Sequence, residues 1–185
     1  MNIDRFIENI VEQIKEVQLK LGYAKEVIRL YFPVQSLCSL LQVQYKNGEE
    51  MLTALEKEKG FSETELGTIR FSLCKNDRIE VCIAPEGAEY VHDNVTNPPF
   101  LASIIDLFKS KHDLTIEEIC DCFAQFNDAY VCEKMEPGTD FDYVLYFAEH
   151  KPDSWYYCIR TEMGHTIYHR FSEEDYHLLI GQNIS

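Results

Sequence analysis

Residues 155–171, WYYCIRTEMGHTIYHRF, contain the chain's one tryptophan, a cysteine and two of its six histidines. A cysteine beside a histidine can form a nucleophile and base pair, and histidines at suitable spacing can bind zinc. The alternating pattern predicts two strands joined by a tight turn, so the geometry depends on the turn. If Met163 and Gly164 form a two-residue loop, Cys158 faces His169.

A three-residue loop over 162–164 fits the residue types better. It places Gly164 in the left-handed conformation, and Met163 does not need a positive φ. In this register Tyr157 faces His169, and Cys158 lies on the other face across from Tyr168. We predict this register, which separates the thiol from the imidazole. His165 and His169 would stand about 13 Å apart along the strand, too far to share one ion. The segment is therefore predicted to be structural, with no metal site.

A second candidate for chemistry is His92, which stands beside Asp93 in the segment YVHDN. Loops and strand ends often carry catalytic residues. His92, Cys158 and His169 together define the alternative hypothesis, a small enzyme or ligand-binding protein with a cleft near the strand ends. The sequence has no phosphate-binding loop, no G-x-S-x-G and no H-E-x-x-H motif, so we predict no catalytic residues and no cofactor.

Aromatic residues are dense between 141 and 177, where ten occur in 37 residues. In strands, one face of the sheet would expose tyrosines with arginines between them, and both residue types are enriched in binding hot spots. The predicted binding residues are Tyr146, Tyr156, Arg160, Tyr168 and Arg170. The alternative is a sheet buried on both faces, or ordinary cross-strand tyrosine pairs, and the sequence does not separate the two.

The formal charge of −15 is concentrated after residue 60. Residues 1–60 carry eight Lys/Arg and nine Asp/Glu, whereas residues 61–185 carry nine and 23. Such a surface repels nucleic acid and anionic lipid and favours a basic protein partner, as in an immunity or antitoxin role. The alternative is that the charge only keeps the protein soluble.

The seven cysteines are an odd number without any C-x-x-C spacing, so we expect reduced, mostly buried thiols in a cytoplasmic protein. Cys120 and Cys122 lie two apart on a predicted helix, where they cannot share a metal as neighbours. Residues 1–18 carry charged residues every few positions between apolar ones, which is the pattern of an amphipathic helix and not of a signal peptide. No apolar run in the sequence is long enough to span a membrane.

The first 60 residues predict helices. Apolar residues recur at helical spacing from Ile3 to Val17 with a stop at Gly22, a second helix is expected from about Tyr23, a third after Pro33, and a fourth over 48–60. Residues 68–84 then predict a hairpin. A three-residue loop over 75–77 puts Ile69, Phe71 and Leu73 opposite Ile83, Val81 and Ile79. A turn at 84–87 and a short strand at 88–92 should follow.

The remainder predicts a helix over 98–110 and a second helix over 115–126, which opens with the capping box of Thr115 and Glu118. Four strands follow over 129–135, 141–149, 155–162 and 165–171, and Ser172 with Asp175 caps a last helix. The predicted fold is α+β: a helical N-terminal half, a β-hairpin, two helices, and a C-terminal antiparallel meander of about four strands with a terminal helix. We expect one domain, 1–185, with a near-neutral segment 1–60 and an acidic body 61–185.

Four short aromatic segments, RLYFP at 29–33, EGAEYVH at 86–92, FDYVLYF at 141–147 and YHRFSEEDY at 168–176, carry a resemblance. They resemble an uncharacterised family of small bacterial proteins known as a domain of unknown function. The resemblance spans most of the chain. It implies a bacterial cytoplasmic protein and carries over no activity and no site residues.

Together these features predict a non-enzymatic protein-binding module with an acidic surface, which binds a basic protein and neither nucleic acid nor membrane. The small enzyme or ligand-binding protein is the alternative. An acidic mimic of DNA is less favoured, because no regular series of carboxylates is seen in the sequence. Nothing in the sequence fixes the oligomeric state.

Overall fold

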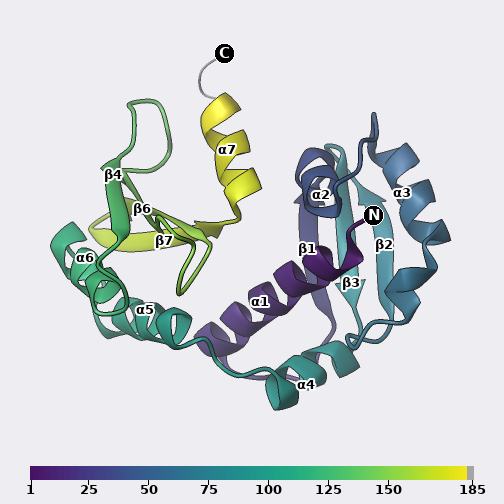
Figure 1. The fold of residues 1–185 in the computed structure, drawn as a ribbon, viewed down its shortest axis with the longest axis horizontal. Helices are drawn as coiled ribbons and strands as arrows, with labels where there is room; N and C mark the ends of the chain where they lie inside the picture. The colour runs from purple at the N-terminus through teal and green to yellow at the C-terminus, as the bar shows by residue number, and fades with distance from the viewer. Residues whose placement is uncertain (183–185) are drawn as a thin grey trace. The chain divides into compact units, whose positions relative to one another are not determined.

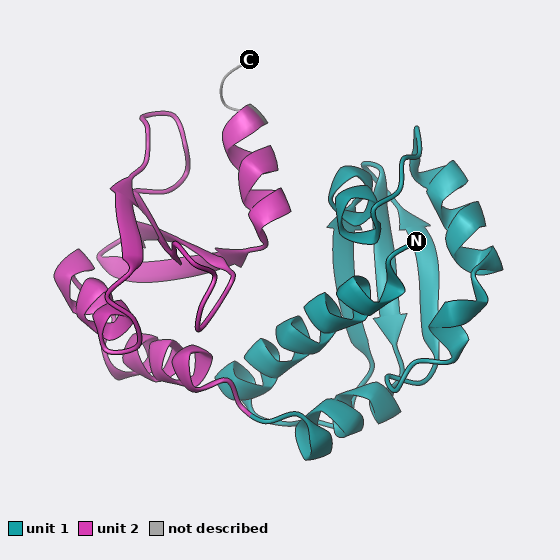
Figure 2. Ribbon diagram, viewed as in Figure 1, with its two compact units in different colours: residues 1–96 teal, residues 97–185 magenta. Residues whose placement is uncertain are grey.

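The computed structural model describes residues 1–182, which pack into two compact units, 1–96 and 97 onward. Figure 1 gives the element labels and Figure 2 the two units. Seven α-helices and two antiparallel sheets make up the described residues, so the predicted α+β fold is confirmed.

Unit 1 is a three-stranded antiparallel sheet with helices packed on one face. Its elements are α1 (Ile3–Leu21), β1 (Ile28–Pro33), α2 (Val34–Leu41), α3 (Gly48–Lys57), the 3-10 helix η1 (Lys59–Ser62), β2 (Ile69–Cys74), β3 (Arg78–Ile83) and α4 (Pro85–Asn94). The strand order is β1-β3-β2. Phe6, Ile10 and Ile14 of α1 are fully buried in the core that this sheet shares with its helices. The spacing of these residues puts them on one helical stripe.

The helices expected after Pro33 and over 48–60 are present as α2 and α3, the latter ending at Lys57, and two finer predictions in unit 1 are also confirmed. Helix α1 ends at Leu21, and the following Gly22 has a φ of 87°, a conformation that a side chain would strain. Strands β2 and β3 pair with the expected register, in which Ile69, Phe71 and Leu73 face Ile83, Val81 and Ile79. The odd-length loop keeps all of these apolar residues on one face.

Three other predictions in unit 1 were wrong. The helix expected from Tyr23 is absent, and residues 28–33 form β1, whose Ile28, Leu30 and Phe32 alternate toward the core as they pair with β3. The turn expected at 84–87 and the short strand expected after it at 88–92 are both replaced by α4 and its N-cap. Pro85 is tolerated in the first turn of that helix, and Ala88 and Val91, one turn apart, are both buried.

Unit 2 is a four-stranded antiparallel meander with helices on both faces, and its element types are those predicted. The elements are α5 (Pro99–Ser110), α6 (Ile116–Ala124), β4 (Tyr130–Lys134), β5 (Tyr143–Phe147), β6 (Tyr156–Glu162), β7 (His165–Phe171) and α7 (Glu173–Gln182). The strand order follows the chain. Phe100 of α5 meets Phe147 and Tyr157 edge-on at 4.8 and 5.6 Å, the geometry that aromatic rings favour.

The predicted helix caps are present. Thr115 and Glu118 form the capping box of α6, and the Asp175 amide donates to Ser172 Oγ at 3.2 Å before α7. Both sets of bonds satisfy amides that the first helical turn leaves without partners.

The predicted register of the last hairpin was wrong. Glu162 pairs with His165 and Cys158 with His169, so the loop is the two-residue Met163-Gly164 turn. Their φ values of 52° and 80° are both positive, as a type I′ turn requires. The twist of such a turn matches that of the strands, and the gain offsets the strain at Met163, whose side chain is 94% exposed.

No helix among residues 1–182 is long and apolar enough to cross a membrane. The charge boundary expected at residue 60 falls within unit 1 and does not coincide with the division at 96. The single domain over 1–185 stays a prediction.

Candidate functional site

The corrected register divides the predicted binding residues between the two faces of the unit 2 sheet. Residues that pair directly across antiparallel strands share a face. Tyr146, Tyr156 and Arg160 therefore lie on the face that α7 covers, and Tyr168 and Arg170 lie on the face toward α5 and α6. The structure does not bring the five together on one surface.

On the α7 face, tyrosines from three elements form a stack. The ring of Tyr156 lies 4.5 Å from that of Tyr146 on β5 and 4.5 Å from that of Tyr176 on α7, and both pairs are close to parallel. Burial raises the pKa of each phenol, and that of Tyr176 rises to about 12. The stack holds α7 on the sheet, so these rings fill an internal interface.

Arg160 is the predicted binding residue of this face that keeps substantial exposure. Its guanidinium contacts Glu162 at 3.1 Å, and 34% of its side chain is accessible. A partly exposed pair of this kind contributes little to stability. Its role in binding stays a prediction.

On the opposite face Arg170 is part of a buried polar cluster. Its side chain is 2% exposed, its guanidinium carbon lies 4.2 Å from the ring centre of Trp155, and Nη2 lies 3.7 Å from Asp153 Oδ2. Asp153 also accepts hydrogen bonds from the Trp155 amide at 2.7 Å and the Tyr157 hydroxyl at 2.8 Å. This arrangement pairs a buried cation and anion, which is a structural role.

Cys158 and His169 face each other, yet the thiol lacks the accessibility that catalysis requires. Cys158 is 0% exposed, and burial raises the pKa of its thiol to about 12, whereas the nucleophile in such a pair is a thiolate. His169 is exposed, with its ring 5.4 Å from that of Phe141. His92 belongs to α4 of unit 1, where it stacks on Tyr23 at 4.2 Å.

The α5–α6 connection presents a different set of side chains, the acidic face of α6, which we define as Asp113, Glu117 and Asp121. All three are exposed, and the side chain of Asp113 is 77% accessible. Glu117 and Asp121 are four residues apart on one side of the helix. Asp113 precedes the helix cap by two residues. Glu117 and Asp121 therefore share one side of α6, and Asp113 lies in the connection just before the helix.

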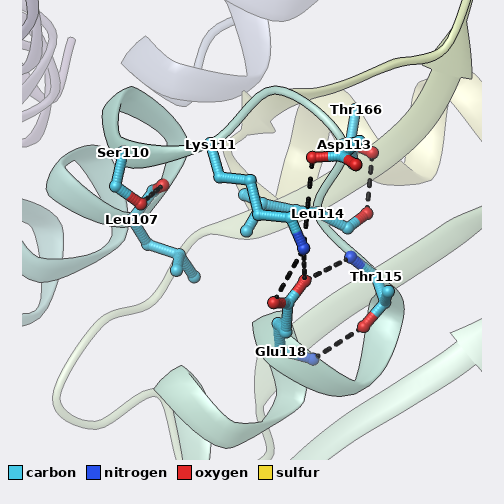
Figure 3. A network of polar contacts seen from close by, with 8 residues as sticks. All are labelled: Leu107, Ser110, Lys111, Asp113, Leu114, Thr115, Glu118 and Thr166. Carbon is cyan, nitrogen blue, oxygen red and sulfur yellow. Dashed lines mark hydrogen bonds and ion pairs between the residues drawn. The ribbon is translucent and has the colours of Figure 1, made fainter.

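A polar network fixes the start of this face (Figure 3). Lys111 Nζ lies 3.0 Å from both carboxylate oxygens of Glu118 and 4.0 Å from Asp113 Oδ1. The amide of Thr115 donates to Glu118 at 2.8 Å, and the Glu118 amide donates to Thr115 Oγ1 at 3.3 Å. The Thr115 amide and Lys111 hold the pKa of Glu118 below its ordinary value.

The same connection is anchored to β7 by Thr166, a buried residue (Figure 3). Its hydroxyl donates to the Leu114 carbonyl at 2.7 Å, and its amide donates to the His112 carbonyl at 2.7 Å. Because Thr166 donates hydrogen bonds to the backbone carbonyls on both sides of Asp113, the acidic face of α6 has a fixed support. Sequence reasoning missed this anchor, since nothing local pairs residue 166 with residues 112 and 114.

The described residues contain no group of three His, Cys, Asp or Glu side chains that could hold a metal ion. Cys122 is buried and Cys120 is half-buried, as residues two apart on a helix point in different directions. All seven cysteines are free thiols.

Residues 3–180 match the model of the DUF3877 family, described as a "Domain of unknown function, E. rectale Gene description". The chain belongs to this family, and the resemblance noted from its aromatic segments is confirmed. No curated protein and no solved structure shows significant similarity to the chain.

Proposed function

We propose that the protein is a non-enzymatic protein-binding module, and that unit 2 binds a basic protein partner on the acidic face of α6. The observation that carries this proposal is the exposure of Asp113, Glu117 and Asp121 on a backbone fixed by Thr166 and the capping box. A fixed backbone lowers the conformational entropy that is lost when an arginine or lysine binds these carboxylates.

The charge balance around this face supports the same partner. Residues 97–185 carry six Lys/Arg and sixteen Asp/Glu. Lys111 Nζ lies 4.0 Å from Asp113 Oδ1, but its closer partner is Glu118 at 3.0 Å. A field of this sign speeds the approach of a cationic surface and repels nucleic acid and anionic lipid, so neither of these is proposed as a partner. The proposed setting is the cytoplasm, where the free thiols would stay reduced.

The geometry does not support the alternative of a small enzyme that uses His92, Cys158 or His169. Facing a histidine would favour a cysteine nucleophile, but burial of Cys158 and the raised pKa of its thiol oppose that role. We therefore propose only the binding module for unit 2.

The test is a comparative capture from bacterial extract at 50 mM salt, with bound proteins identified and quantified by mass spectrometry. The baits are the wild type, a Glu117→Lys/Asp121→Lys variant, and a Glu26→Lys/Glu49→Lys control with the same charge change at exposed positions of unit 1. Glu49 and Glu117 both occupy the second position of a helix, so the reversals disturb comparable local structure.

The proposal expects basic proteins that the wild type and the control retain equally and that the α6 variant loses at least tenfold. Circular dichroism of each bait checks that the fold is kept. Equal retention by the α6 variant and the control would contradict a specific role for this face. Recovery of nucleic acid or lipid in place of basic protein would contradict the proposed partner class.

A further inference from the structure

The outward face of the unit 1 sheet is the strongest feature that the acidic face of α6 does not explain. The core packs on the face that carries Ile79, Val81 and Ile83, and the helices of unit 1 lie against that side. Strand pairing fixes the other side as three rows: Arg29, Cys82 and Arg70; Tyr31, Glu80 and Ser72; Pro33, Arg78 and Cys74. We call these nine residues the outer face.

The arginines and the tyrosine of the outer face are accessible. Arg29, Arg70 and Arg78 are exposed, the Arg29 side chain is 57% accessible and Tyr31 is 51% exposed. Exposed tyrosine and arginine together are the composition of binding hot spots.

Glu80, at the centre, is fully engaged by its neighbours. Its carboxylate accepts hydrogen bonds from Arg29 Nη1 at 2.8 Å, Ser72 Oγ at 2.8 Å and the Tyr31 hydroxyl at 3.0 Å. Arg29 and these hydroxyls hold the pKa of Glu80 below its ordinary value. The bonds preorganise the central row and balance the charge of Arg29.

The two remaining arginines have no such balance. Within residues 1–182 neither Arg70 nor Arg78 has an ion-pair partner. The outer face thus carries three cations and one anion in a chain whose net charge is −15. A local reversal of sign on an otherwise acidic protein favours a negatively charged partner at that place.

The spacing of the arginines indicates the size of the partner. Arg29 and Arg70 lie two strands apart, so their Cα atoms are about 10 Å apart, and Arg78 lies four residues further along, roughly 14 Å from either. One carboxylate or phosphate cannot reach all three. A segment with several acidic side chains can, and each guanidinium can bind a carboxylate through two parallel hydrogen bonds.

We propose that the outer face of the β1-β3-β2 sheet is a docking surface for an acidic segment of another protein. A small molecule is disfavoured, because such ligands use concave sites and this is an open sheet face. Nucleic acid is disfavoured because its regular row of phosphates would extend beyond three arginines onto an acidic chain, whereas a short acidic segment need not. The proposal goes beyond the one for unit 2, because it concerns another surface and a partner of opposite charge.

A selection experiment reads the chemistry of the partner without assuming its identity. Randomised twelve-residue peptides displayed on phage are selected on the wild type, and enriched peptides are synthesised and measured by fluorescence anisotropy at 50 mM salt. Each is measured against Arg70→Glu/Arg78→Glu and a control, Lys46→Glu/Lys57→Glu, which makes the same charge change at exposed positions outside the outer face. Arg70→Gln/Arg78→Gln serves if the reversal unfolds the protein.

The expected result is enrichment in Asp and Glu, with binding at least tenfold weaker to the arginine variant and within twofold of wild type for the control. Enrichment of non-acidic peptides, no enrichment, or equal loss in both variants would overturn the proposal. Tighter, arginine-dependent binding of a single-stranded oligonucleotide would replace it with a nucleic-acid site. Arginine-dependent self-association in analytical ultracentrifugation would replace the partner with a second copy. None of these results bears on the α6 variant, so the two proposals fail separately.

Discussion

Cys158 on β6 and His169 on β7 are directly paired, but only the histidine is accessible to solvent. The thiol lies with Val144 and Tyr156 beneath Tyr176 and Leu179 of α7. A paired cysteine and histidine could act as a nucleophile and base, but here the cysteine is part of the hydrophobic core. The reactivity and the pKa of the Cys158 thiol therefore test whether α7 covers the sheet.

We predict that Cys158 reacts with iodoacetamide at pH 8 at least 1,000-fold more slowly in the folded protein than in the denatured one. With its pKa raised to about 12, roughly one thiol in 10⁴ is ionised at that pH, against about a quarter for an ordinary cysteine. Time-resolved peptide mass spectrometry measures the rate, and the protein in guanidinium supplies the reference. Alkylation of Cys158 at the denatured rate would show that α7 does not cover it.

The same thiol predicts a dependence of stability on pH. Its folded pKa lies above its unfolded value of about 8.5, so the unfolded chain alone loses this proton between that pH and about 12. Its contribution is complete below about pH 8.5 and falls as pH rises toward 12. Cys158→Ala should therefore lose less stability than wild type between pH 9 and 11 in urea unfolding. Buried tyrosines add to the slope in both proteins, and identical slopes would contradict the burial of Cys158.

The Met163-Gly164 turn predicts opposite effects at adjacent positions. Met163→Asn should stabilise the protein by about 0.5 kcal/mol, because Asn tolerates the positive φ that Met adopts there. Gly164→Ala should destabilise it by about 1 kcal/mol for the same reason. Urea unfolding measures both, and the exposure of Met163 excludes a change in core packing. Destabilisation by Met163→Asn would favour the three-residue loop.

The buried pair of Asp153 and Arg170 predicts a large loss on removal of one partner. Asp153→Ala should lower the free energy of unfolding by about 3–5 kcal/mol, because it leaves the guanidinium buried. Asp153→Ala/Arg170→Met should recover much of that loss. The control is Arg160→Ala on the neighbouring strand, whose partly exposed ion pair should contribute less than about 1 kcal/mol. Equal losses for Asp153→Ala and Arg160→Ala would mean that Arg170 is solvated.

Alternation of apolar residues sufficed to predict the β2-β3 register, because one slip would have scattered Ile69, Phe71 and Leu73. The predicted register of the last hairpin was wrong because the loop length was chosen only from the preference of glycine, over methionine, for a positive φ. The strain of one left-handed Met is small, and the type I′ turn offsets it because its twist matches that of the strands. β1 was missed although Ile28, Leu30 and Phe32 alternate with Arg29 and Tyr31, the pattern of a strand with one polar face.

The candidate surfaces were less predictable than the elements. The excess of acidic residues after residue 60 was visible in the sequence, but their presentation depends on Thr166, which lies 52 residues from the carbonyl it anchors. The outer face required β1 as a strand, since Arg29 and Arg70 become neighbours only through β3. Both the acidic face of α6 and the outer face depend on contacts between residues far apart in the sequence, which no local pattern encodes.

The most direct test of the proposed function is hydrogen exchange of the protein alone and in complex with the basic partner recovered by capture. Binding on the acidic face of α6 predicts slower exchange at Asp113 and along Ile116–Ala124, with β1, β2 and β3 unchanged. The Glu26→Lys/Glu49→Lys variant should give the same protection pattern. Protection confined to other segments, with α6 exchanging as in the free protein, would contradict the proposal.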